Sequence, residues 1–408
     1  MKAIISRDNK PRLALTKLLS LLSPRAFLGP QSPVQLDIIP DPLLPAEDWA
    51  IADTRLCGLC GSDYKQVFMH GTLDNPMTSM ISWPQVLGHE AVGVISQLGS
   101  AVTRLALGDR VVLNPWLSCQ TRGLEPCHFC QQGHLAQCLN FDGGKIARGI
   151  HHGNSATATG GFAQRVPAHQ SQWFKIPDGV SNEAAALADP FSVSFHAILK
   201  APPQDNGKVM VYGCGTLGLL AIAILRALFP SVEIFAVARF EHQAALAKQL
   251  GAHRVLPHRP ARTIIETVGK LIDTPLHEPW RGLPMLNHGL DAIYDTVSAP
   301  ETLEVGVRIT RSRGAIVLIG VEPPKRFEWT PIYFKEISVV GSNGFGIEEW
   351  EGRRQHAMEW YFEFIQNKGF DATAIITHRF AMADYKQAFM TCYDQGESAA
   401  VKVLFDRF

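Results

Sequence analysis

Four cysteines lie within one short stretch of the chain, and their spacing suits metal binding. Cys127 and Cys130 are separated by two residues, Cys138 follows them, and Cys119 precedes them. Two thiolates at this spacing can face one ion, and four sulfurs complete the tetrahedral shell of a structural Zn²⁺. The loop contains glycine and proline but few large apolar residues, so a hydrophobic core cannot hold it. We therefore predict a structural zinc site, against the alternative of four buried free thiols.

A second set of metal-binding residue types is spread over three segments. Cys60 precedes Gly-Ser-Asp, His89 lies within Gly-His-Glu, and Asp189 precedes a proline. Cysteine, histidine and carboxylate are the ligands of a catalytic zinc, which takes three protein ligands and leaves one position open. Each segment alone is weak evidence, because a lone histidine is more often a core residue and an Asp-Pro pair is more often a turn. Only their joint occurrence favours a catalytic metal centre.

A glycine-rich turn in the second half of the chain is typical of dinucleotide binding. Gly213, Gly215 and Gly218 form the pattern Gly-x-Gly-x-x-Gly between an apolar strand and an apolar helix. The first glycine permits the tight turn, the second admits a pyrophosphate, and the third lets the helix pack on the sheet. The phosphates then face the helix N-terminus, at Thr216 and Leu217. The alternative is a glycine-rich turn without a ligand.

The end of the next strand bears on the choice of cofactor. Sites for NAD place an acid about 20 residues after the turn, where it binds the ribose hydroxyls. Here that position holds Ala238 and Arg239, and Arg239 can pair with a 2′-phosphate. This exchange favours NADP over NAD. Glu241 leaves NAD open, and stacking of Arg239 on the adenine is a third reading.

The elements that must position these residues differ along the chain. Residues 1 to about 200 are rich in Gly, Pro, Cys and His with short apolar runs, which is typical of an irregular antiparallel β domain. From about 204 to 342, strands alternate with helical patterns, which predicts an α/β domain with a doubly wound parallel sheet. The strand-like runs are 209–212, 234–237, 292–294 and 315–319. A helix near 350–366 and a strand at 400–405 follow, and residues 13–33 are expected to form a surface insertion.

The composition excludes several classes of protein. The chain has 408 residues, with 38 basic and 38 acidic side chains, so no net field attracts nucleic acid or an anionic membrane. A local basic patch stays possible on this count. No apolar run approaches the roughly 20 residues that a membrane span needs, and no signal peptide is recognised. We expect a cytoplasmic protein whose eight cysteines are thiols or metal ligands.

Taken together, the motifs resemble the zinc-dependent medium-chain dehydrogenase/reductase family, which includes alcohol, polyol and threonine dehydrogenases. Cys-Gly-Ser-Asp at 60–63, Gly-His-Glu at 88–90, the cysteine loop at 119–138 and the later glycine turn occur in the family's order. The resemblance covers nearly the whole chain. It implies a GroES-like β-rich catalytic domain over 1–203, completed by 343–408, and a Rossmann dinucleotide-binding domain over 204–342.

The resemblance also implies roles for individual residues. Cys60 and His89 would bind the catalytic zinc, and either Asp189 or Glu90 would be the third ligand. The residues implied to act on the substrate proton or to orient the site are Ser62, which accepts the proton, Asp63, which orients the zinc ligands, and Lys65, which stands where many members carry a relay histidine. Backbone around Ile319 and Val321 would line the nicotinamide.

The expected activity is reversible hydride transfer between an alcohol and NAD(P), with NADP preferred. The substrate would be a secondary alcohol, a polyol or a sugar-like molecule, and the protein a homodimer or homotetramer. One alternative is a reductase of activated C=C bonds on the same fold, and another is a nucleotide-binding protein without catalysis. His151 and His152 are expected at the surface.

Overall fold

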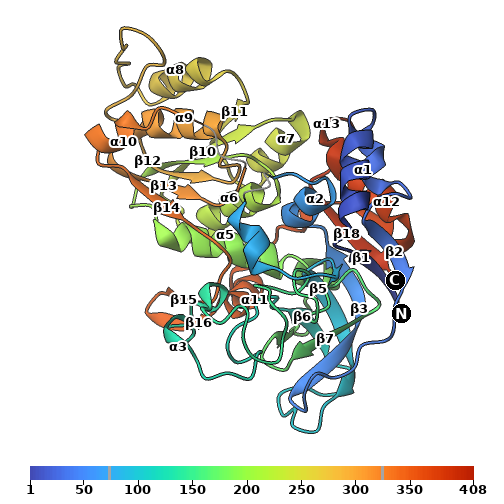
Figure 1. Ribbon diagram of the computed structural model, residues 1–408. Helices are drawn as coiled ribbons and strands as arrows, with labels where there is room; N and C mark the ends of the chain where they lie inside the picture. The colour runs from blue at the N-terminus through green and yellow to red at the C-terminus, as the bar shows by residue number, and fades with distance from the viewer. Residues whose placement is uncertain (72–74, 323–325) are drawn as a thin grey trace. The chain divides into compact units, whose positions relative to one another are not determined.

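The computed structural model describes residues 1–71, 75–322 and 326–408 and separates into two compact units (Figure 1). The first consists of Met1–Asp189 with Phe345–Phe408, and the second of Pro190–Gly344. The chain therefore leaves the first unit, forms the second, and returns. Helix α5 (Ala188–Lys200) belongs almost wholly to the second unit by this division, whereas the sequence suggested a boundary after residue 203.

The first unit is built on a seven-stranded sheet whose neighbouring strands are antiparallel except for one pair. The order is β17-β18-β3-β5-β6-β8, with β7 paired to β3, and β17 and β18 run parallel. The strands are β3 (Trp49–Gly58), β5 (Glu90–Leu98), β6 (Arg110–Leu113), β7 (Arg165–His169), β8 (Trp173–Lys175), β17 (Ile376–Ala381) and β18 (Lys402–Arg407). Their short apolar runs supply buried residues such as Ile95, Val111 and Phe405 to one core. This sheet confirms the predicted β-rich unit.

Smaller elements surround that sheet. A three-stranded sheet has the order β2-β1-β4, and β15 pairs with β16 as a hairpin. These strands are β1 (Lys2–Ser6), β2 (Val34–Ile38), β4 (Gln85–Val86), β15 (Ile347–Trp350) and β16 (Arg353–His356). The helices are α1 (Lys10–Ser20), α2 (Gly61–Val67), α3 (His128–Gln131), α4 (Asn182–Ala185), α11 (Ala357–Lys368), α12 (Tyr385–Tyr393) and α13 (Gln395–Ser398). The helix expected near 350–366 begins only at Ala357, because the residues before it form the hairpin.

The second unit is a six-stranded parallel sheet with the order β11-β10-β9-β12-β13-β14. Its strands are β9 (Lys208–Tyr212), β10 (Glu233–Ala238), β11 (Arg254–Pro257), β12 (Leu290–Asp295), β13 (Thr310–Leu318) and β14 (Ser338–Gly341). Its helices besides α5 are α6 (Thr216–Leu228), α7 (Glu241–Gln249), α8 (Ala261–Leu271), α9 (Pro300–Ile309) and α10 (Thr330–Phe334), and they lie on both faces of the sheet (Figure 1). The order reverses between β9 and β12, as in a doubly wound dinucleotide-binding sheet. The predicted fold class is thus confirmed for this unit.

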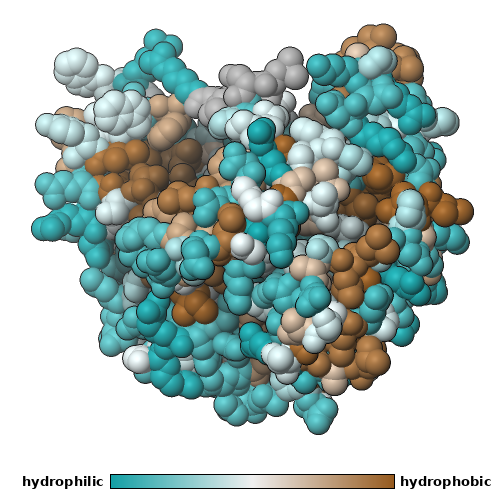
Figure 2. All heavy atoms as spheres, turned by 60° about the horizontal axis from the view of Figure 1, so that its bottom comes forward, coloured by the Kyte–Doolittle hydropathy of each residue, from teal (hydrophilic) through white to brown (hydrophobic). Residues whose placement is uncertain are grey.

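The surface is mixed in character. Figure 2 shows a face that is mostly hydrophilic, with several hydrophobic patches among the polar side chains. Within the three described ranges, no helix is both long and apolar enough to cross a membrane.

Candidate metal centres and dinucleotide site

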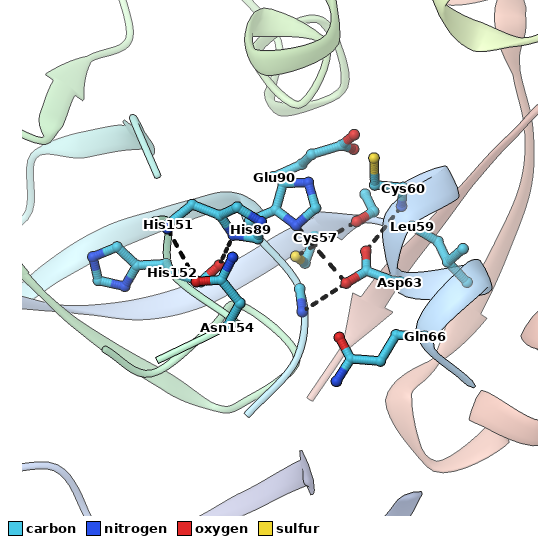
Figure 3. Close-up of polar contacts among 12 residues, drawn as sticks. Cys57, Leu59, Cys60, Asp63, Gln66, His89, Glu90, His151, His152 and Asn154 are labelled. Atoms are coloured by element: carbon cyan, nitrogen blue, oxygen red, sulfur yellow. Dashed lines mark hydrogen bonds and ion pairs between the residues drawn. The ribbon is translucent and has the colours of Figure 1, made fainter. Parts of the chain in front are cut away.

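Cys60, His89 and Glu90 come together in the first unit, and their ligand atoms lie within 4.8 Å of one another (Figure 3). Cys60 follows β3 as the N-cap of α2, and β5 begins at Glu90, directly after His89. The antiparallel pairing of β3 with β5 sets Gly58 opposite Glu90. A Cβ atom at Gly58 would collide with the Glu90 carboxylate, so only glycine leaves room for that side chain.

Asp63 joins the segments that carry these ligands. One carboxylate oxygen, Oδ2, accepts a hydrogen bond from the Cys60 N–H at 3.0 Å. The other, Oδ1, accepts one from the Gly88 N–H at 3.2 Å. Asp63 is buried, and burial raises the pKa of its carboxyl group above the usual value. The carboxylate thereby holds the start of α2 against the turn before β5, which fits the orienting role implied for it.

One ring nitrogen of His89 is buried beside Asp63. Its Nδ1 makes no hydrogen bond among the residues that the structure describes and lies 3.8 Å from Asp63 Oδ1. Burial by itself lowers the pKa of His89, but the negative charges of Asp63 and Cys60 outweigh it and raise the pKa well above the usual value. A buried imidazole between a carboxylate and a thiol is the arrangement of a metal-ligating histidine. The donor set therefore fits Zn²⁺.

Glu90 forms a buried ion pair with Lys402, a residue that the sequence reasoning missed. Both side chains are 1% exposed, and Lys402 Nζ also donates a hydrogen bond to Leu59 O at 3.3 Å. Lys402 begins β18, which pairs with β3, so residues more than 300 positions apart meet here. The only signal in the sequence was a lysine within an otherwise apolar strand.

Asp189 lies outside the group of three gathered ligand atoms, in the first turn of α5. It is 4% exposed, and its Oδ2 has no hydrogen-bond partner in the described part of the chain. Burial, the largest influence, raises the pKa of Asp189 to about 7, while nearby His89 opposes that rise. The charge of His89 therefore acts on this carboxylate. An unpartnered buried oxygen is available for a cation.

The other predicted catalytic residues lie on α2. Ser62 is exposed in the first turn of this helix, and Lys65 is half-buried one turn later. The expectation for two histidines was wrong, because His152 is fully buried and His151 is half-buried. The His151 ring lies 4.8 Å from the His89 ring, between centroids, and 5.7 Å from the Trp116 ring. Ring packing accounts for the burial of His151, whereas the His152 ring is held by hydrogen bonds to Thr159 O and Gln172 Oε1.

The four clustered cysteines form a second centre, with all sulfurs within 4.8 Å of one another. Cys119 Sγ lies 3.5 Å from Cys138 Sγ and accepts a hydrogen bond from the Cys127 N–H at 3.3 Å. A hydrogen bond from Cys130 lowers the pKa of Cys138 to about 5, which favours the thiolate that metals bind. The structure thus brings Cys119 back to the other three despite the longer intervening loop.

A buried arginine organises this loop. Arg122 is 0% exposed, and its guanidinium donates hydrogen bonds to the carbonyls of Gly143, Ile146 and Gly149. It lies in the extra residues between Cys119 and Cys127. Its role was not predicted, because a lone arginine in a loop is normally exposed.

In the second unit, the glycine turn connects β9 to α6 at the carboxyl edge of the sheet. Gly213 has a φ of 94°, which disfavours any residue with a side chain. A Cβ at Gly218 would collide with the Gly213 carbonyl, whereas a Cβ at Gly215 would meet no atom within 4 Å. Gly215 is the N-cap of α6 and has no side chain to cap it. Open space before the N–H groups of a helix fits a pyrophosphate.

The remaining predicted cofactor residues follow strands of the same sheet. Ala238 ends β10 and is 2% exposed, while Arg239 is exposed and its guanidinium lies 5.2 Å from the centre of the Phe240 ring. Ile319 and Val321 follow β13, and Val321 is 71% exposed. Because the strands are parallel, these residues and the glycine turn share the carboxyl edge, where doubly wound sheets bind ligands.

Two family models match this chain. An alcohol dehydrogenase GroES-like domain matches residues 46–178, and a zinc-binding dehydrogenase domain matches residues 216–360. The first match confirms the GroES-like character predicted for the β-rich unit.

Curated relatives and a solved structure agree with these matches. The chain is 29% identical to L-idonate 5-dehydrogenase of Vitis vinifera, over 86% of each chain. It is 28% identical to (R,R)-butanediol dehydrogenase of Saccharomyces cerevisiae, over 77% of this chain and 80% of that one. The crystal structure of 2R,3R-butanediol dehydrogenase from Bacillus subtilis superposes with a TM-score of 0.71 at 22% identity, over 92% of this chain and 96% of that one, and supports the fold. With both of its units matched, the chain belongs to the zinc-dependent medium-chain dehydrogenase/reductase family.

Proposed function

We propose that this oxidoreductase interconverts a secondary alcohol, polyol or sugar-like alcohol and its carbonyl compound, with zinc in the active site and NADP as the preferred cofactor. The observation that carries the proposal is the meeting of Cys60 and His89, whose segments Asp63 joins, with buried carboxylates on Glu90 and Asp189 as candidates for a third ligand. In support, its relatives are named as dehydrogenases of idonate and butanediol, one matching family model describes zinc-binding dehydrogenases, and two similar solved structures contain NADH or NADP. The names of those relatives support neither the roles of individual residues nor the preference for NADP, and both are part of the proposal.

Cys60 and His89 would hold the catalytic zinc, and we assign the third position to Asp189. Lys402 supports this choice, because its ammonium pairs with the Glu90 carboxylate and so competes with a metal ion for that negative charge. A Glu90 side chain drawn away from Lys402 would leave a buried ammonium unpaired, which is costly. Asp189 has a buried oxygen with no competing partner among the described residues. When bound, zinc supplies a Lewis acid that polarises the substrate oxygen, and the cofactor supplies the hydride acceptor.

The chain's own residues would then handle position and protons. Asp63 accepts a hydrogen bond from the Cys60 N–H and so holds the start of α2 in place. The Cys60 sulfur and the Ser62 hydroxyl both belong to this start of the helix. Ser62 Oγ, exposed in that turn, would accept the alcohol proton and pass it toward solvent. Lys65 lies one turn further along the same helix and would stand near that proton path.

The four cysteines of the loop would hold the structural zinc. Their sulfurs form a closed set, with no open position left for a substrate once four thiolates bind one ion. In the second unit, the turn at Gly213–Gly218 would bind the pyrophosphate. The exposed Arg239 would pair with the 2′-phosphate of NADP, because no acid stands at residue 238 to bind a free ribose hydroxyl.

The test is turnover on a panel of alcohols, ketones and enones with NAD and NADP side by side, together with the zinc content of the purified protein. We expect two zinc ions per chain, higher kcat/KM with NADP, and activity on alcohols and ketones. In Arg239→Ala, kcat/KM for NADP should fall about 10- to 100-fold, since a charged hydrogen bond contributes about 1.5–3 kcal/mol. Its kcat/KM for NAD should hardly change.

Three results would contradict parts of this proposal. Reduction of enones alone would replace the alcohol reaction with C=C reduction. A zinc content of one ion per chain, or full carbonyl reduction by Cys60→Ala, would contradict the proposed catalytic zinc. An Arg239→Ala variant that loses activity equally with both cofactors would contradict the proposed NADP preference.

A further inference from the structure

Helix α1 and the turn after it expose leucines. Leu15, Leu18, Leu21 and Leu22 are 46%, 64%, 80% and 85% exposed. Leu15, Leu18 and Leu22 are spaced three and four residues apart, which sets them on one side of the helix and the turn after it. We call these four residues the outward leucine face. Surface helices normally show the opposite arrangement, with leucines inward and polar residues outward.

Polar side chains fasten the inner side of the same helix. Thr16 is 0% exposed, and its Oγ1 donates a hydrogen bond to Gln31 O at 3.2 Å. The Arg12 guanidinium donates to Ser32 O at 3.3 Å and to Pro30 O at 3.2 Å. Rotating the leucines inward would break these bonds, so the outward leucine face is a fixed property of the fold.

The charge of this segment indicates what covers the leucines. Residues 9–36 contain Lys10, Arg12, Lys17 and Arg25 and no acidic residue, although the whole chain has a formal net charge of zero. Lys10, Lys17 and Arg25 are exposed. Exposed leucines with lysine and arginine beside them are the pattern of a helix that lies in the interface of an anionic membrane. Contiguous apolar surface with a polar rim marks an interaction site.

We propose that α1 docks the protein on the surface of an anionic phospholipid bilayer, with the outward leucine face inserted among the acyl chains and the cations against the headgroups. The sequence expectation of no membrane partner rested on net charge, which averages this basic segment with acidic residues elsewhere. A peripheral helix needs no membrane-spanning segment. The proposal does not depend on which alcohol the enzyme oxidises.

Co-sedimentation of the zinc-loaded full chain with vesicles tests this proposal. We expect binding to phosphatidylcholine vesicles that contain phosphatidylserine, weaker binding at raised salt, and little binding to phosphatidylcholine alone. The double variant Leu18→Glu/Leu22→Glu should bind about tenfold or more weakly. Arg25→Gln should weaken binding about fivefold, because one cation near the surface contributes about 1 kcal/mol.

The control is Leu43→Glu/Leu107→Glu, which changes two leucines that are 85% and 65% exposed outside α1. This control should bind vesicles as the parent does, and all variants should keep the dehydrogenase activity in solution. Absence of binding to the phosphatidylserine vesicles would overturn the proposal, as would equal loss in the control. A parent that is oligomeric by size-exclusion chromatography and becomes monomeric in Leu18→Glu/Leu22→Glu, without binding lipid, would assign the face to a second copy instead.

Discussion

Single residues shape the electrostatics of the candidate catalytic centre, and Lys402 is one of them. Its positive charge acts on the buried carboxylates of Glu90 and Asp189 and on the half-buried Cys60. Burial lowers the pKa of Lys402, but Glu90 and the other acids more than compensate and raise it. The lysine thus keeps its proton and offsets part of the negative charge that accumulates around the ligands.

Replacing Lys402 by methionine should destabilise the first unit by about 3–5 kcal/mol, because Glu90 would be buried without its partner. Denaturant unfolding of the metal-free protein measures this loss. The double variant Lys402→Met/Glu90→Gln removes both charges and should recover most of the stability. If the double variant is as unstable as the sum of the two single variants, the pair is not coupled and Lys402 acts through packing alone.

At the scale of elements, two glycines of the turn after β9 should have different roles, one in ligand binding and the other in stability. Gly215→Ala adds a methyl group in open space, so the free energy of unfolding should stay within about 0.5 kcal/mol of the parent. The KM for NADP should rise, because the methyl group occupies the space for the pyrophosphate. Gly218→Ala should instead destabilise the second unit by about 1–3 kcal/mol, since its Cβ would collide with the Gly213 carbonyl.

Thermal unfolding and cofactor kinetics on these two variants check the distinction. Equal destabilisation by both substitutions would mean that the open space beside Gly215 does not exist in solution.

The start of α11 predicts a pH dependence. His356 is the N-cap of this helix, accepts a hydrogen bond from the Met358 N–H through Nδ1, and stacks on Phe174. Burial lowers its pKa to about 3, so the folded protein holds the neutral ring. Between pH 6.5 and 3 the unfolded chain binds the extra proton, and stability therefore falls as the pH is lowered through this window.

At pH 5 this histidine should cost about 2 kcal/mol relative to pH 7, from about 1.4 kcal/mol per unit of pKa difference. His356→Asn keeps a capping acceptor and should flatten that part of the stability curve. Urea unfolding of both proteins at several pH values measures the difference, and parallel curves would show that His356 is protonated in the folded state.

At the scale of the whole molecule, the first unit would contain both metal centres, and loss of the structural one should lower stability. The four-cysteine centre holds a loop that has no large core of its own, so Cys127→Ser should lower the zinc content by one ion and lower the Tm. Cys392→Ser is the matched control, because Cys392 lies outside both clusters of ligand atoms. A Cys127→Ser protein with unchanged zinc content would exclude the loop as a metal site.

Much of this arrangement could be predicted from local patterns. The parallel sheet, the glycine turn and the four-cysteine loop each lie within a continuous stretch, where periodicity and spacing are informative. What could not be predicted depends on contacts between distant segments. Lys402 meets Glu90 only because β18 pairs with β3, and the burial of His152 depends on the fold around it. Residues 13–33 were expected at the surface, but the side on which α1 carries its exposed leucines was not predicted, because a sequence gives the period of a helix but not the direction of its faces.

The place of β18 in the sheet also has a consequence for synthesis on the ribosome. This strand lies between β17 and β3, and it is translated only after the whole of the second unit. Until then, the segments that carry Cys60 and His89 have been made, but Glu90 has no counter-ion and β3 has an open edge. The second unit is therefore complete on the nascent chain before the first can close, and the Glu90–Lys402 pair is among the last contacts of the protein to form.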